Sequence, residues 1–310
     1  SKRPEQVSQA AGERPEWFDY GVELALLAQK MGKRIYIVAE KMNELEIIYK
    51  IAKRLNVKPN IGIRIKLASS GSGKWEGSGG DASKFGLTSA ELIEALEYLE
   101  SVGLKDCLKL IHFHIGSQIT DMGAFQALCT RINELQRWFE ERKIRLEIVN
   151  VGGGLGVDYE HPDKHAIPTF EEYFRVFHKF LELRDGQEVH FELGRAIVAQ
   201  CGSLVTKVLY VKEGRKKKFA IVDAGMNDLI RPALYHAYHK IENITSAEAT
   251  EQYDVVGPVC ESSDCFGQAV VLPKTQRGDL IAIRTAGAYG EIMASHYNLR
   301  KFAPSVYSKN

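Results

Sequence analysis

The strongest constraint on the fold is a change of hydrophobic periodicity near residue 200. Before it, residues 18–195 alternate short β-branched runs with helical spacing, which is typical of βα units around a parallel sheet. The strands predicted in this part are 34–39, 61–67, 108–114, 146–151 and 188–193. Beyond about residue 200 the apolar residues alternate with a period of two between tight turns, which predicts a β-rich second domain.

Local signals mark helix starts and one loop inside this pattern. Thr88 with Glu91 and Thr169 with Glu172 have the spacing of a capping box, in which each side chain satisfies the other residue's free backbone donor. The run 69–80 is rich in glycine and serine, and it predicts a loop after the second strand.

Charge and cysteine content exclude several function classes. Lys and Arg total 41 against 40 Asp and Glu, so the formal net charge is +1. This balance disfavours general electrostatic binding of nucleic acid. No run approaches the roughly 18 apolar residues of a membrane helix, and the polar start lacks the apolar core of a secretion signal. We therefore expect a cytoplasmic protein with no membrane contact. The five cysteines form no CxxC pair, which argues against a disulfide framework and a zinc site.

The residues after each predicted strand carry the candidate chemistry, because ligands of parallel α/β folds gather at the carboxyl ends of strands. The third strand ends in His112 and His114, which share one face because side chains alternate along a strand. His112 is interpreted as a core residue. His114 stands beside Gly116 and Ser117 at the strand tip, and it is a candidate ligand contact.

The fourth strand runs into Gly152, Gly153 and Gly154. Successive glycines let backbone N–H groups turn toward an anion, so a phosphate nest and a tight turn are both compatible with this pattern. The pattern does not match a dinucleotide-binding fingerprint, because Val157 stands where the last glycine of that fingerprint is needed. Trp75 likewise stands where a Walker loop needs Ser or Thr.

Further candidates lie at the fifth strand and beyond it. Glu192 and Arg195 flank Gly194, and they could offer an anion to a cationic ring nitrogen and a cation to an acidic group, or form a structural ion pair. Arg231 and Tyr235 are four residues apart, which would place them on one helical face as a carboxylate clamp. Later in the chain, Cys260 is a thiol among acidic and hydroxyl residues, and an Ala-Gly-Ala-Tyr-Gly run contains Tyr289.

Taken together, the motifs HxHIGSQ, GGGLG, ExGR, GPxCES and AGAYG occur in an order that resembles the fold-type III, pyridoxal-phosphate (PLP)-dependent basic amino-acid decarboxylases. The resemblance implies an α/β chain with an alanine-racemase-like (β/α)8 TIM barrel joined to a C-terminal β-domain. It places a partial PLP-binding barrel domain at 1–199 and the β-domain at 200–310. Within the family, residues 108–310 resemble diaminopimelate decarboxylases, whereas residues 17–112 resemble biosynthetic arginine decarboxylases.

The resemblance also implies a role for each candidate residue. His114 would stack on the pyridine ring, Glu192 would pair with the ring nitrogen, and Cys260 would donate a proton. The retained substrate carboxylate would be held by Arg231 and Tyr235 together with Arg195, which also belongs to the cofactor site. The phosphate would be held by Ser117, Gly152, Gly153, Gly154, Gly194 and Tyr289.

One residue bears on the substrate. Arginine and ornithine decarboxylases of the family carry Asp directly after the cysteine, whereas this chain has Glu261, as the diaminopimelate enzymes do. The expected reaction is therefore the decarboxylation of meso-diaminopimelate to L-lysine, with arginine decarboxylation as the alternative. The resemblance also implies a homodimer with shared active sites, in which Lys84 would pair with Asp264 of the other subunit.

The family's cofactor lysine lies on the first barrel strand in a context such as YAVKAN, and no such segment occurs in these 310 residues. The strand at 34–39 corresponds to the fourth barrel strand of the family, so about three strands are expected to be missing. Lys66 is interpreted as a surface or barrel-wall residue rather than a substitute for that lysine. These departures favour an impaired decarboxylase or, alternatively, a non-catalytic paralogue that serves as a dimerisation partner.

Overall fold

The computed structural model describes residues 17–67, 84–164 and 168–308, and the loop predicted at 69–80 lies outside them. The chain forms two compact units. The first comprises Ser1–Gly154 and Tyr173–Glu192, and the second comprises Leu155–Glu172 and Leu193–Asn310. These units interleave along the sequence, so the division into domains of residues 1–199 and 200–310 stays a prediction.

The first unit is built on a sheet of five parallel strands that are ordered as in the sequence. The strands are β1 (Ile37–Ala39), β2 (Ile61–Arg64), β3 (Leu108–His112), β4 (Ile148–Asn150) and β5 (Glu188–His190). All five predicted strands are confirmed, although each is shorter than predicted. Residues of β2, β3 and β4 are buried almost without alternation, as expected for parallel strands covered on both faces.

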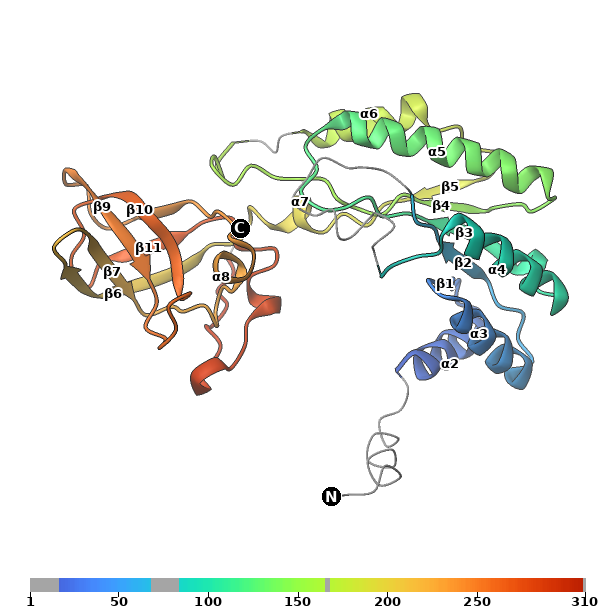
Figure 1. Cartoon of the computed structure of the whole chain (residues 1–310), viewed down its shortest axis with the longest axis horizontal. Helices are drawn as coiled ribbons and strands as arrows, with labels where there is room; N and C mark the ends of the chain where they lie inside the picture. Colours follow the sequence, from blue (N-terminus) through green and yellow to red (C-terminus); the bar gives the residue numbers. More distant parts are fainter. Residues whose placement is uncertain (1–16, 68–83, 165–167, 309–310) are drawn as a thin grey trace, which may run out of the picture. The chain divides into compact units, whose positions relative to one another are not determined.

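Helices alternate with these strands and run beside them (Figure 1). They are α2 (Trp17–Lys30), α3 (Met42–Leu55), α4 (Ser89–Ser101), α5 (Met122–Glu141) and α6 (Phe170–Phe180), with a short 3₁₀ turn η2 (Lys105–Cys107). Both predicted capping boxes are confirmed. Thr88 Oγ1 accepts from the Glu91 N–H while a Glu91 oxygen accepts from the Thr88 N–H, and Thr169 and Glu172 repeat this exchange before α6.

The second unit contains a six-stranded sheet in the order β10-β9-β7-β6-β11-β8. Its strands are β6 (Leu204–Glu213), β7 (Lys218–Val222), β8 (Ile241–Asn243), β9 (Thr250–Val256), β10 (Cys265–Pro273) and β11 (Leu280–Ile283). Only β7 and β9 pair in parallel, and the end strands β8 and β10 also contact each other, so the sheet curls toward closure. This confirms the β-rich second part. Short helical turns accompany it: α7 (Arg195–Val198), α8 (Arg231–Tyr235), η3 (Glu291–Met293) and η4 (Tyr297–Leu299).

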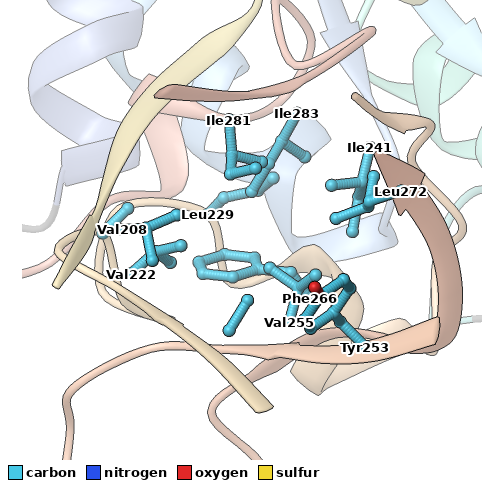
Figure 2. Packing of buried hydrophobic residues seen from close by; sticks show 12 residues of the cluster. Val208, Val222, Leu229, Ile241, Tyr253, Val255, Phe266, Leu272, Ile281 and Ile283 are labelled. Atoms are coloured by element: carbon cyan, nitrogen blue, oxygen red, sulfur yellow. The ribbon is translucent and has the colours of Figure 1, made fainter. Parts of the chain in front are cut away.

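The period-two pattern places one face of this sheet in a core (Figure 2). Alternate residues of single strands point inward together, as Tyr253 and Val255 do on β9 and Ile281 and Ile283 on β11. The buried cluster comprises Val208, Ala220, Val222, Ala224, Leu229, Ile241, Tyr253, Val255, Phe266, Leu272, Ile281 and Ile283. This core anchors the loops that carry the candidate residues of the second unit.

Two further observations concern the chain as a whole. All five cysteines are free thiols, and Cys260 is exposed. Over the ranges given above, none of the helices combines the length and the apolar character that crossing a bilayer requires.

Candidate functional site

The carboxyl ends of the five parallel strands bring charged and polar side chains to one edge of the first unit. Arg64 ends β2, and its guanidinium donates to Glu40, which follows β1, at 2.5 Å. His112 and Asn150 end β3 and β4, and Glu192 follows β5. A pocket opens at this edge between Val38, Glu40, Glu44, His112 and Glu192. The predicted gathering of polar residues at strand ends is confirmed.

Glu192 is held as an anion at this edge. Its Oε2 lies 3.3 Å from His112 Nε2, and its Oε1 accepts a hydrogen bond from Asn150 Nδ2 at 2.9 Å. The hydrogen bond from His112 is the main cause that lowers the Glu192 pKa to about 2, and the Asn150 amide adds to it. The side chain is still 54% exposed, so this fixed carboxylate remains accessible. His112 is buried as expected, and it also orients Glu192.

The glycine turn after β4 lies directly beside Glu192, whose N–H donates to the Gly152 carbonyl at 2.9 Å. Gly152 has a φ of +69°, and a Cβ there would lie 2.2 Å from the Phe113 carbonyl oxygen. Gly154 has a φ of +110°, and its Cβ would lie 2.7 Å from the Gly116 oxygen. The close approach of the β3 and β4 loops therefore requires both glycines, whether or not they also bind an anion.

His114 links the two loops. Its Nδ1 lies 3.4 Å from the Gly153 N–H, which donates toward it. Burial lowers the His114 pKa, and the charges of Arg64 and His112 add to this, so the ring is neutral at pH 7. A neutral imidazole that accepts at Nδ1 presents a flat face suited to stacking on an aromatic ligand. Ser117 follows in the same loop and is partly buried.

Gly194, Arg195 and Tyr289 come together in the second unit. The Arg195 Cζ lies 5.2 Å from the centroid of the Tyr289 ring. A Cβ on Gly194 would lie 3.2 Å from the Tyr289 hydroxyl, so this glycine leaves room for the phenol. Gly194 and Tyr289, which the sequence assigned to the phosphate site, are therefore neighbours, and Arg195 lies beside them.

Arg231 and Tyr235 are the first and last residues of α8, as their spacing predicts. The Arg231 Cζ lies 5.8 Å from the Tyr235 ring centroid. Arg231 is only 3% exposed, and burial lowers its pKa. Among the residues that the structure describes, the Nε of Arg231 finds no hydrogen-bond partner. A buried cation in this state is suited to binding an anionic ligand.

Cys260 and Glu261 are exposed on the loop between β9 and β10, and Asp264 shapes that loop. Asp264 is 3% exposed, and its carboxylate accepts hydrogen bonds from the backbone N–H groups of Val259 at 2.8 Å and Met226 at 2.7 Å. Within its own chain this carboxylate is buried, and the predicted pairing of Lys84 with Asp264 of another subunit stays a prediction.

Replacing Asp264 with alanine is expected to lower the free energy of unfolding by about 3 kcal/mol, because two buried backbone donors lose a charged acceptor. Denaturant unfolding measures this loss. Asp163→Ala is the control, since Asp163 is an exposed partner of Arg284 and its loss is expected to cost less than about 1 kcal/mol. Equal losses in the two variants would contradict the role given to Asp264.

The sequence alone did not single out Asn150 or Tyr159, nor the backbone contacts of Asp264. Asn150 had a detectable signal, since it is a polar residue at the end of an otherwise apolar strand that leads into the glycines. Tyr159 had none, because its partners lie 36 and 72 residues away in the sequence. Lys66 lies near Glu91, whose pKa is lowered mainly by Thr88 and also by the Lys66 charge, and its surface or barrel-wall role stays a prediction.

Comparison with known proteins identifies the class. A family model described as "Pyridoxal-dependent decarboxylase, C-terminal sheet domain" matches residues 35–287. The chain belongs to the pyridoxal-dependent decarboxylase family, for which PLP is the expected cofactor. The resemblance and the α/β fold class of barrel and β-domain inferred from the sequence are thereby confirmed.

Relatives of both expected kinds are found. The chain is 54% identical over 273 residues to diaminopimelate decarboxylase of Bacteroides thetaiotaomicron, covering 87% of this chain and 70% of that protein. It is 64% identical over 272 residues to biosynthetic arginine decarboxylase of Phocaeicola vulgatus, covering 82% of this chain and 42% of that protein. The crystal structure of diaminopimelate decarboxylase from Helicobacter pylori complexed with L-lysine matches with a TM-score of 0.80 at 37% identity, covering 90% of this chain and 68% of that one.

The described residues fit PLP in three respects. Glu192 offers a fixed anion to a cationic ring nitrogen, and His114 offers a neutral flat ring. Arg231 is a buried cation whose Nε lacks a partner, which suits an anionic group of the cofactor or of its substrate. The first two residues belong to the first unit and Arg231 to the second.

Proposed function

We propose that the chain binds PLP and acts in the decarboxylation of meso-diaminopimelate to L-lysine. Membership of the decarboxylase family supports the reaction class. The observation that carries the proposal is Glu192, which His112 and Asn150 hold ionised beside the glycine turn. A carboxylate with a pKa of about 2 stays charged at every pH at which an amino-acid decarboxylase would work.

Bound PLP supplies an electron sink for the pair left behind when the α-carboxyl group departs as carbon dioxide. In this proposal Glu192 keeps a proton on the ring nitrogen, and His114 covers one face of the ring. The phosphate is bound by Ser117, Gly152, Gly153, Gly154, Gly194 and Tyr289. Backbone N–H groups and hydroxyl groups are donors from which phosphate oxygens accept hydrogen bonds.

Residues of the second unit act on the substrate. Arg231 and Tyr235, with Arg195, bind the carboxylate that the product retains. The Cys260 thiol donates a proton to Cα after carbon dioxide has left. Glu261 binds the distal ammonium group, which its longer side chain reaches in a substrate whose far end is itself an amino acid. The neighbouring positions of Cys260 and Glu261 on one exposed loop support a shared approach to the substrate.

A homodimer completes this proposal. The loop with Cys260 and Glu261 is exposed and has a buried base formed by Asp264. Such a loop can enter the active site of a second subunit while its own chain keeps it in shape. We place this dimer in the cytoplasm. Arginine is the second candidate substrate, and the identity with the Phocaeicola vulgatus arginine decarboxylase favours it.

Release of carbon dioxide from meso-diaminopimelate and from L-arginine tests the substrate, with PLP present throughout. We expect a higher kcat/KM for diaminopimelate, and we expect Glu261→Asp to reduce that preference by about tenfold, because the shorter carboxylate no longer reaches the distal ammonium. Glu248→Asp, an exposed change before β9, is the matched control. Activity on arginine alone would exclude diaminopimelate as the substrate.

The non-catalytic alternative has its own test. Borohydride treatment in the presence of PLP, followed by peptide mass mapping, locates any lysine that has become covalently attached to the cofactor. A single modified lysine together with carbon dioxide release supports the decarboxylase. Absence of both, in a chain that still dimerises on sedimentation, supports the dimerisation partner instead.

A further inference from the structure

His112 lies in the middle of the strand-end edge, and its backbone holds it there. It is the last residue of β3, the central strand of the five-stranded sheet, and it pairs in register with Arg64 of β2 and Asn150 of β4. Its carbonyl oxygen also accepts a hydrogen bond from the Ile65 N–H at 2.9 Å. His112 is only 6% exposed. The position of its imidazole is therefore set by the sheet and not by a loop.

The imidazole of His112 has one hydrogen-bond partner among the residues that the structure describes, and this partner is Glu192. Its Nε2 lies 3.3 Å from Glu192 Oε2. Its Nδ1 is buried and has no partner within the described ranges. Since Glu192 is ionised and can only accept, the proton in this contact lies on Nε2. A buried ring nitrogen without a partner is destabilising, so stability alone does not explain a histidine at this position.

The two ends of this contact differ in their freedom. Glu192 follows β5, and its side chain is 54% exposed, so a carboxylate without partners there would rotate between several rotamers. Asn150 donates to Oε1 at 2.9 Å, and the His112 Nε2–H faces Oε2. A donor on each oxygen fixes the plane of the carboxylate and leaves each oxygen a second acceptor site. Without the His112 donor, the carboxylate could turn about its remaining hydrogen bond.

We propose that His112 is a positioning residue, which fixes the Glu192 carboxylate for its contact with the ring nitrogen of the cofactor. This inference rests on the function proposed above, and it gives a role in that function to a residue that the sequence suggests only as part of the core. His112 acts through Glu192, since its Nε2–H is occupied by the carboxylate. A charged carboxylate with a fixed direction binds a pyridinium N–H better than one that rotates, because no rotational freedom is lost on binding.

The first test needs no cofactor. ¹³C NMR titration of the Glu192 carboxyl group in the PLP-free protein measures its pKa, which is about 2 in the unaltered chain. His112→Phe keeps a planar ring at the buried position and removes the donor, so we expect this pKa to rise toward its ordinary value of 4.5. His112→Gln can place an amide N–H close to the position of Nε2, so its Glu192 pKa should stay below that of His112→Phe.

The second test uses the PLP-loaded protein. The ¹⁵N chemical shift of PLP labelled at its ring nitrogen reports the fraction of that nitrogen that is protonated. We expect His112→Phe to lower this fraction and to reduce kcat about tenfold, which corresponds to the loss of one hydrogen bond to a charged group. His112→Gln should restore both. A purely structural role would alter the melting temperature but not the protonated fraction.

His190→Phe is the matched control, because His190 Nε2 lies 3.0 Å from a different glutamate, Glu188, in an exposed pair on β5. It should change neither the Glu192 pKa nor the ring-nitrogen shift. An unchanged pKa in His112→Phe, or equal effects of His112→Phe and His112→Gln on the protonated fraction, would overturn the positioning role while the proposed function stands. Failure of the unaltered protein to bind PLP would overturn the proposed function and with it the contact to the ring nitrogen, whereas the titration separately decides whether His112 holds Glu192.

Discussion

Gly152→Ala is expected to lower the free energy of unfolding by about 4 kcal/mol or more, the largest stability effect of a single added methyl group at the strand-end edge. The new Cβ would lie 2.2 Å from the Phe113 carbonyl oxygen, where no real Cβ fits. Phe113 cannot yield easily, because its side chain is fully buried and its N–H donates to the Asn150 carbonyl at 2.9 Å. Backbone strain at a φ of +69° adds to the clash.

Gly103→Ala separates the clash from the strain. Gly103 has a φ of +73°, but no atom lies within 4 Å of the position that its Cβ would take. The free energy of unfolding of this variant should fall by only about 1 to 2 kcal/mol, which is the cost of placing alanine in the left-handed conformation. Denaturant unfolding of the two variants measures both losses. If they are equal, the β3 and β4 loops separate without cost, and the close approach is not what requires glycine at 152.

Glu192→Gln is expected to reduce kcat for decarboxylation at least about 100-fold, because an uncharged amide cannot keep a proton on the ring nitrogen. The amide has nearly the same shape, and its oxygen can still accept from Asn150, so the fold should be kept, although the melting temperature should fall because the ionised contact with His112 is lost. Retention of PLP during gel filtration gives a readout that does not depend on turnover, and it should fall as well.

Glu188→Gln is the control for this prediction. Glu188 lies on β5, the strand that leads to Glu192. It forms an exposed ion pair with Arg34 at 2.7 Å and does not contact Glu192. The rate of this variant should match that of the unaltered protein. A Glu192→Gln variant with an unaltered kcat would remove Glu192 from the reaction.

The ionisation of Glu192 has a direct consequence for pH dependence. Its pKa in the folded chain, about 2, lies below its ordinary value of 4.5. The stabilisation that this difference represents is therefore present above pH 4.5 and is lost as the pH falls toward 2. Between pH 5 and pH 9 Glu192 does not titrate, so any acid limb of activity in that range must belong to another group.

The positions of the strands were predictable, because parallel βα units leave a strong hydrophobic pattern in the sequence. The exact ends of the strands were not predictable. Residues 34–36 were predicted to be in the first strand, yet β1 begins at Ile37. Instead, Arg34 pairs with Glu188 and the Tyr36 hydroxyl donates to Glu147. Side-chain contacts therefore replace the backbone hydrogen bonds between strands in this segment. The third strand likewise ends at His112, because the next residues turn into the loop that packs on Gly152.

Site residues were predictable where topology alone brings them together. Glu192 and the glycine turn lie side by side because neighbouring parallel strands end at one edge. The hydrogen bonds of Asp264 to two backbone donors were not predictable, because no side-chain pattern reveals them. Tyr159 was missed for a similar reason, since only the folded second unit brings its hydroxyl to two distant arginines.

The Asn150 side chain links two parts of the strand-end edge through two hydrogen bonds. Its oxygen accepts from the Gly152 N–H while its nitrogen donates to Glu192, so the orientation of one amide fixes both the turn and the acid. Aspartate at this position could accept from the Gly152 N–H but would repel Glu192. Leucine could form neither hydrogen bond. The turn and the acid are thus coupled through one small side chain, and a substitution there alters both together.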